Sequence, residues 1–219
     1  MSKLYPKLAR AITLAAKEGG EDPEANGKLK AAIATAKAQN LPKDNLETAI
    51  KRASGRDAEN ISEANYEGKA AHGVLLWVEC ATDNPTRTVA NVKNHFKKCG
   101  GEVVQSGALD FLFQRKTVIE FNIPEGTEAD DIELGLIDGG LEEFEVNADG
   151  KAYAYGSFES FGPLNAALEA LGIEATKSSH QRIATSPIEI TEEQMTEVEV
   201  IIDRLEDDDD VQAVYTNIA

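Results

Sequence analysis

The segment TVIEFNI at residues 117–123, with LEEFEVNADGKAYAY at residues 141–155, decides the fold. The first segment alternates polar and apolar residues as a strand does. The second predicts two strands joined by a turn that ends in Asp149-Gly150. Apolar residues at helical spacing predict helices over residues 128–138 and 164–171, and a last strand region ends at residue 184. The order β-α-β-β-α-β is typical of a ferredoxin-like fold.

A second α+β unit surrounds the first one in the sequence. Its predicted elements are a strand, a helix, two strands, a helix and a strand, at residues 73–80, 85–99, 102–105, 108–114, 191–205 and 211–218. Asn84 before Pro85 marks one helix start, and a capping box from Thr191 to Gln194 marks the other. We therefore predict an α+β protein in which a ferredoxin-like domain, residues 116–186, is inserted in a discontinuous domain, residues 66–115 plus 187–219.

The first 57 residues predict a small helical bundle. Apolar residues recur at helical spacing over residues 3–18, 24–39 and 42–53, and the second of these segments is rich in alanine, which favours helix. A polar linker is predicted from Ser54 to about residue 65.

Charge is sorted along the chain. Residues 1–56 carry 11 Lys and Arg against 6 Asp and Glu, whereas residues 117–219 carry 4 against 25, and the whole chain has a net charge of −17. A basic front end on an acidic body indicates a protein that meets a polyanion with one end. We therefore expect DNA or RNA, the latter including the ribosome, as the partner.

The sequence lacks the motifs of membrane proteins, secreted proteins, metalloproteins and several classes of enzyme. No apolar run has the length of a transmembrane helix, and no secretory or lipidation signal is seen, so we expect a cytoplasmic protein with reduced Cys80 and Cys99. The cysteines and histidines show no metal-ligand spacing, and no nucleotide-binding or nucleophile motif is found. We expect no metal, no cofactor, no membrane partner, no small-molecule substrate and no enzymatic activity.

The candidate nucleic-acid-binding residues are cations of the predicted helices, because Lys and Arg attract phosphates with little sequence readout. They are Lys3, Lys7, Arg10, Lys28, Lys30, Lys37, Lys43, Lys51, Arg52, Arg87, Lys93 and Lys97. The alternative is that these side chains are solvated faces opposite the apolar stripes. For Arg87, near the positive end of its helix, the alternative is an ion pair with a carboxylate of the same protein.

Two further features allow more than one interpretation. The run Glu206–Asp210 opposes the dipole at the end of a helix. A flexible solvated turn is favoured for it, and binding of a divalent cation or contact with the basic bundle are the alternatives. Tyr153 and Tyr155 share parity on one strand, which makes them candidates for a stacking platform, although core or edge packing is favoured.

The sequence resembles the YebC/PmpR family along its whole length. The resembling motifs are Asp22-Pro23-Glu24-Ala25-Asn26, Asn40-Leu41-Pro42-Lys43-Asp44-Asn45, Tyr66-Glu67-Gly68, Glu79-Cys80-Ala81-Thr82-Asp83-Asn84 and Leu205-Glu206-Asp207-Asp208-Asp209-Asp210-Val211. The resemblance implies a helical N-terminal domain and two α+β domains, one of ferredoxin-like type inserted in the other. It also implies a probable transcriptional regulatory protein that binds DNA.

Two other functions stay open at this point. Some members of the family, including mitochondrial translational activators of cytochrome oxidase synthesis, act in translation. A ribosome- or mRNA-associated translation factor is therefore the first alternative. An adaptor that binds protein through the acidic C-terminal domains is the second alternative. The sequence predicts no oligomeric state.

Overall fold

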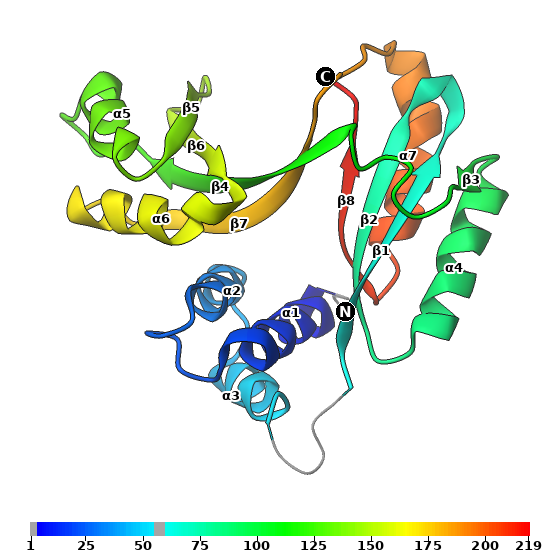
Figure 1. The fold of residues 1–219 in the computed structure, drawn as a ribbon, viewed down its shortest axis with the longest axis horizontal. Helices are drawn as coiled ribbons and strands as arrows, with labels where there is room; N and C mark the ends of the chain where they lie inside the picture. Colours follow the sequence, from blue (N-terminus) through cyan, green and yellow to red (C-terminus); the bar gives the residue numbers. More distant parts are fainter. Residues whose placement is uncertain (1–3, 55–59) are drawn as a thin grey trace.

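The computed structural model describes residues 4–54 and 60–219. It contains a bundle of three helices and two four-stranded antiparallel sheets, each covered by two helices (Figure 1). The second sheet is built from a segment that interrupts the first sheet in the sequence. The predicted α+β class, with a ferredoxin-like unit inserted in another α+β unit, is therefore confirmed.

The bundle packs through small side chains. Its helices are α1 (Leu4–Gly19), α2 (Gly27–Ala38) and α3 (Lys43–Lys51). Ala15, Ala36 and Ala49 are buried around Ile12 and Leu29, so the helices approach closely without leaving a void.

The contacts of Asn26 show why the motif Asp22-Pro23-Glu24-Ala25-Asn26 ends in asparagine. Its side-chain oxygen accepts a hydrogen bond from Leu29 N at 3.1 Å and so caps α2, while its amide donates to Ala15 O and Gly20 O at 2.8 Å each. One buried side chain thus satisfies the end of α1 and the start of α2.

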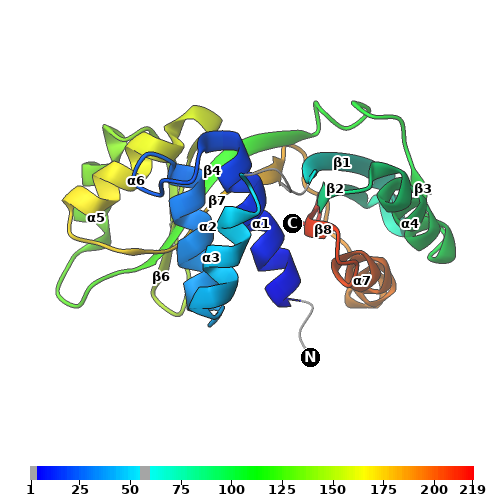
Figure 2. The same ribbon diagram turned by 90° about the horizontal axis from the view of Figure 1, so that it is seen from below.

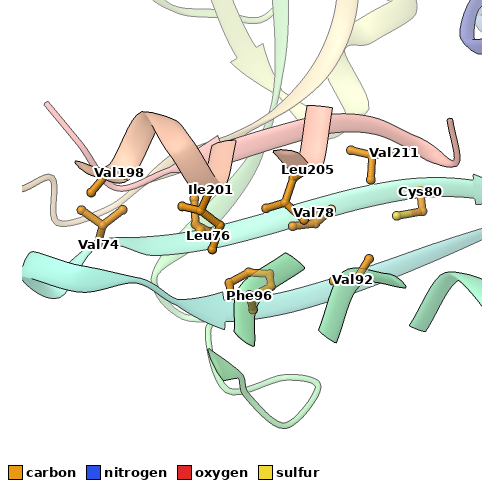
Figure 3. Close-up of a cluster of buried hydrophobic side chains, with 10 residues drawn as sticks. All are labelled: Val74, Leu76, Val78, Cys80, Val92, Phe96, Val198, Ile201, Leu205 and Val211. Atoms are coloured by element: carbon orange, nitrogen blue, oxygen red, sulfur yellow. The ribbon is translucent and has the colours of Figure 1, made fainter. Parts of the chain in front are cut away.

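The first sheet has the order β3-β1-β2-β8. Its elements are β1 (Ser62–Lys69), a 3₁₀ turn η1 (Ala71–Gly73), β2 (Leu75–Thr82), α4 (Pro85–Lys98), β3 (Glu102–Val103), α7 (Glu192–Glu206) and β8 (Val211–Thr216). Both helices cover the same face of the sheet, where Leu76 and Val78 of β2 meet Phe96 of α4 and Ile201 and Leu205 of α7 (Figure 3).

Two of the predicted boundaries in this region are wrong. The segment from residue 62, predicted to be linker, is β1, the antiparallel neighbour of β2. The predicted strand over residues 108–114 is mostly turn, and the strand that follows it begins at Phe113. The buried carboxylate of Glu67 holds this turn, accepting hydrogen bonds from Gly107 N and Leu109 N at 2.6 Å each.

The second sheet has the order β5-β6-β4-β7, which is the ferredoxin-like arrangement. Its elements are β4 (Phe113–Asn122), α5 (Ala129–Ile137), β5 (Leu141–Val146), β6 (Lys151–Ser157), a 3₁₀ turn η2 (Phe158–Ser160), α6 (Phe161–Ala170) and β7 (Ala175–Ala184). α5 and α6 bury Ile119 and Phe121 of β4 on one face. Tyr153 and Tyr155 of β6 lie half-buried on the opposite face.

The two sheets are held together by a mixed contact around Trp77. The indole packs edge-on against Phe113 with ring centroids 6.0 Å apart, and the Arg182 guanidinium lies 3.7 Å above it. Arg182 Nε also donates to Glu79 Oε1 at 3.1 Å. Since Trp77 and Glu79 belong to β2 and Arg182 to β7, these residues fix one sheet against the other.

Candidate nucleic-acid interface

Helix α4 is defined by its two ends. Asn84 accepts a hydrogen bond from Arg87 N at 3.1 Å, Pro85 occupies the first turn, and Gly100 follows the helix with φ +72°. Thr88, Val92 and Phe96 recur every four residues and are buried. The spacing that anchors α4 on the first sheet directs its remaining side chains to solvent.

The solvent-facing side of α4 is basic. The helix has the sequence PTRTVANVKNHFKK and contains no Asp or Glu. Lys93, Lys97 and Lys98 are exposed and make no ion pair within the described part of the chain. Asn94 is exposed and lies three and four residues before Lys97 and Lys98, whereas Asn91 is half-buried and lies on the side of α4 that faces residues 207–210. Lysines of this kind suit phosphates, and asparagines suit base edges.

Arg87 is used inside the protein. The Asp210 side chain is 3% exposed, and both of its oxygens accept from Arg87 Nη2 at 2.9 Å. It also accepts from Thr88 Oγ1 at 2.7 Å and forms an ion pair with Arg10 of α1. For Arg87, the structure therefore supports the ion-pair alternative.

Burial and hydrogen bonding have opposite effects on the pKa of Asp210. Burial alone would raise the pKa of Asp210, but hydrogen bonds from Thr88, Arg10 and Arg87 outweigh it and hold that pKa below its usual value. Nearby, Lys7 Nζ donates to Glu206 O, and burial lowers the pKa of Lys7 despite the carboxylates of the same turn. Lys7, Arg10 and Arg87 thus converge on residues 206–210.

The acidic run is therefore not the flexible turn that the sequence favoured. It ends α7 and docks on α1 and α4, where His95 Nε2 lies 3.1 Å from Asp208 Oδ2. The separation of a basic front from an acidic rear along the sequence is not kept in space. Contact with the basic helices, one of the alternatives, is what the structure contains.

The cations of the bundle have weaker partners. Lys28 pairs with Glu18 at 2.8 Å, Lys30 with Glu169 at 3.0 Å, and Lys43 with Glu47 at 3.8 Å, all between largely exposed side chains. Exposed pairs contribute about 0–1 kcal/mol, so a phosphate can compete for these lysines.

The remaining candidates differ in what surrounds them. Lys37 and Lys51 are exposed without an ion pair in the described structure. Arg52 is exposed, and Lys3 lies outside the described residues.

The candidates do not form one surface. Lys37 and Lys51 belong to α2 and α3, whereas Lys93 and Lys97 belong to α4, and the first sheet lies between these helices in both views (Figures 1 and 2). The structure therefore divides the eleven described candidates into a set on the bundle, a set on α4, and a set that contacts residues 206–210, namely Lys7, Arg10 and Arg87.

An open groove of about 610 Å³ runs beside α4. Arg87, Asn91 and His95 line it from α4, and Arg204 and the turn of residues 207–210 line it from α7. Sequence reasoning missed Asn91, Asn94 and Arg204 because their side chains become neighbours only when α4 and α7 pack on the same sheet.

Two other features are absent from the part of the chain that the structure describes. Within residues 4–54 and 60–219, no three His, Cys, Asp or Glu side chains are grouped to hold a metal ion. In the same residues, no helix is long and apolar enough to cross a membrane.

Comparison with known proteins identifies the family. Residues 1–56 match the model described as the TACO1/YebC protein N-terminal domain, and residues 61–218 match the TACO1/YebC second and third domain. The chain belongs to the TACO1/YebC family. This confirms the resemblance seen in the sequence.

Close relatives carry regulatory names. A protein of Wolinella succinogenes is 57% identical over 222 residues, covering 100% of this chain and 92% of its own, and one of Campylobacter curvus is 59% identical over 218 residues with the same coverage. Both are named probable transcriptional regulatory proteins.

One solved structure has the same fold. It is the crystal structure of a conserved hypothetical protein from Aquifex aeolicus, which is 34% identical, with a TM-score of 0.87, and matches 99% of this chain and 89% of its own.

Proposed function

We propose that this chain is a non-enzymatic, cytoplasmic transcriptional regulatory protein that binds double-stranded DNA through the exposed face of α4. One observation carries the proposal. In a chain of net charge −17, α4 has no carboxylate and presents Lys93, Lys97 and Lys98 without acidic partners in the described structure. The regulatory names of the relatives point in the same direction.

The proposed contacts have two kinds of role. Lys93, Lys97 and Lys98 neutralise phosphates and so supply affinity that depends on salt. Asn94, which is exposed and lies three and four residues before Lys97 and Lys98, donates and accepts hydrogen bonds at base edges. The bundle lysines Lys37 and Lys51 give a second phosphate contact on a separate surface. Arg10 and Arg87 are left out of this proposal because Asp210 holds them.

Filter binding of a DNA duplex at several salt concentrations tests the proposal. The double variant Lys93→Gln/Lys97→Gln should bind more weakly, and its slope of log affinity against log salt should fall by about 1.8, since each neutralised phosphate contributes about 0.9. The variant Lys151→Gln/Lys177→Gln is the matched control. It also removes two positive charges, but from the second sheet.

Three results would count against the proposal. They are absence of DNA retention by the wild type, an unchanged salt slope in the α4 variant, and equal loss in both variants. Retention of structured RNA without retention of DNA would replace it with the ribosome- or mRNA-associated alternative.

A further inference from the structure

Strand β6 carries two tyrosines on a face that no helix covers in the described structure. Ala152, Ala154 and Gly156 are buried toward α5 and α6, while Tyr153 and Tyr155 alternate with them and are half-exposed on the other face. A tyrosine ring that is open on one side of a sheet can stack on a nucleic-acid base. Both tyrosines are only partly buried, and Lys151 Nζ lies 5.7 Å from the centre of the Tyr153 ring, so a cation already accompanies the aromatic rings on this face.

The sequence of β6 matches a known recognition pattern. RNA-binding sheets of this topology carry Lys/Arg-Gly-Phe/Tyr-Gly/Ala-Phe-Val-x-Phe/Tyr on a central strand. β6 and the residue after it have the sequence KAYAYGSF, residues 151–158. The basic first position, the two aromatic positions and the final aromatic are all present. There are three departures. Ala152 and Gly156 are buried on the helix side, and Tyr155 stands where the pattern has Phe and keeps an aromatic ring.

The position of β6 in the sheet fits as well. It is a central strand, between β5 and β4, as in RNA-recognition modules whose aromatics stack two or three bases. Across the ladder, Tyr155 is level with Val118 of β4, whose short side chain is buried. Tyr153 is level with Glu120, which Lys151 and Lys177 neutralise at 2.8 Å and 3.5 Å.

The charges around the two tyrosines differ between one side of the face and the other, which favours one orientation of a bound nucleic acid. Glu143 and Glu145 of β5 are exposed beside Tyr155 and Tyr153, and Tyr155 Oη donates to Glu145 Oε2 at 3.1 Å. Carboxylates repel phosphates but accept hydrogen bonds from the amino groups of bases. The bases are therefore favoured toward β5, and the phosphates toward β4 and β7.

The face leads to lysines of the bundle. Asn122 is on the same side of β4 as Glu120 and Val118, which are two and four residues away, and it is level with Lys151. Asn122 also lines a groove of about 1100 Å³ together with Lys37 of α2 and Lys43 of α3. Lys37 is exposed without an ion pair in the described structure, and Lys43 holds only an exposed one.

We propose that this face of the second sheet binds single-stranded RNA, with two bases stacked on Tyr153 and Tyr155 and the backbone directed along β4 toward Lys37 and Lys43. The site is separate from α4, so it goes beyond the DNA contact proposed above. Its occupant is recognised by stacking and by base edges, whereas the α4 face meets the phosphates of a duplex.

Fluorescence anisotropy of the full chain with a labelled, mixed-sequence RNA of about ten nucleotides tests this proposal. Stacking on one aromatic ring changes affinity by about 5- to 150-fold, so Tyr153→Ala and Tyr155→Ala should each weaken RNA binding within that range. Tyr153→Phe and Tyr155→Phe keep the ring and should retain most of the affinity. Phe111→Ala, at a phenylalanine that is 91% exposed outside the sheet, is the matched control and should have no effect.

The outcomes separate this site from the DNA site. The double variant Tyr153→Ala/Tyr155→Ala should lose RNA binding but should still retain duplex DNA and keep the melting temperature of the wild-type protein. The double variant Lys93→Gln/Lys97→Gln should bind duplex DNA more weakly but keep its affinity for the RNA. The proposal is overturned if the wild type does not bind the RNA, if the alanine variants bind it as well as Phe111→Ala does, or if the phenylalanine variants lose it equally. Equal affinity for single-stranded DNA of the same sequence would overturn the assignment to RNA.

Discussion

Replacing Asp210 with asparagine should loosen the contact between the bundle and the first sheet. The change keeps the shape of the side chain but removes the charge that Arg10, Arg87 and Thr88 share. It also turns an amide N–H₂ toward one of the guanidinium groups, because asparagine can accept through only one of the two positions.

The magnitude follows from burial and exposure. Hydrogen bonds to a charged group contribute about 1.5–3 kcal/mol each, and loss of one partner from a buried pair costs about 3–5 kcal/mol. Asp210 is 3% exposed, but the side chains of Arg10 and Arg87 are 25% and 44% exposed, so water takes over part of their interaction. We expect a loss of about 2–3 kcal/mol at pH 7, or roughly 5–10 °C in melting temperature.

The contribution of Asp210 to the free energy of unfolding depends on pH. The pKa of folded Asp210 is held below 3.8, so its contribution to the free energy of unfolding is complete above that value and is lost as pH falls through the lower, folded pKa. The asparagine variant cannot titrate at this position. The stability difference between wild type and Asp210→Asn should therefore be constant from pH 5 to 7 and shrink below about pH 4.

Urea denaturation of both proteins at several pH values measures the difference. Asp209→Asn is the matched control, because Asp209 is the neighbouring carboxylate and is exposed. The control should change stability by less than about 0.5 kcal/mol. The reasoning is refuted if Asp210→Asn behaves like the control at pH 7, or if the difference between it and wild type persists unchanged at pH 3.

Three other perturbations probe other parts of the fold. Gly68→Ala should destabilise the first sheet by about 1–3 kcal/mol, because the new Cβ would lie 2.2 Å from the Phe96 ring, whereas Gly162→Ala, with nothing within 4 Å, should be neutral or stabilising in thermal denaturation. Burial raises the pKa of Cys80 to about 12, so mass spectrometry after iodoacetamide treatment at pH 8 should find Cys80 unmodified in the folded protein and modified in urea; modification in both would contradict its burial. Burial and Glu145 raise the pKa of Tyr155 to about 12. In a pH titration followed by tyrosine absorbance, the variant Tyr155→Phe should therefore lack a phenol that ionises well above pH 10 in the wild type. If the variant instead lacks a phenol that ionises near pH 10, the ring is more solvated than described.

The elements with strong local patterns could be predicted from the sequence. The turn at Asp149-Gly150, the cap at Asn84 before Pro85, and the capping box at Thr191 each act within a few residues, and each marks an element that the structure contains. β1 could not be predicted in the same way. Its sequence, SEANYEGK, is mostly polar, and it becomes a strand because β2 and β3 pair with it on both sides.

The site was harder to predict for a related reason. Arg10 and Asp210 are 200 residues apart, and nothing local to either one indicates the other. Composition located the basic helices, but only packing decides which of their cations are occupied. Lys93 and Lys97 stay open because α4 has no acid of its own, whereas Arg87, on the same helix, meets a carboxylate from the other end of the chain. The boundaries predicted for the domains stay a prediction.

Asp210 is synthesised 200 residues after Arg10 and 123 residues after Arg87. Until Asp210 has been added to the growing polypeptide, both guanidinium groups lack this carboxylate. The ion pairs that join the bundle to the first sheet therefore form late in synthesis. A polypeptide that stops short of the acidic turn would lack them, and its N-terminal helices would not be held on the first sheet in this way.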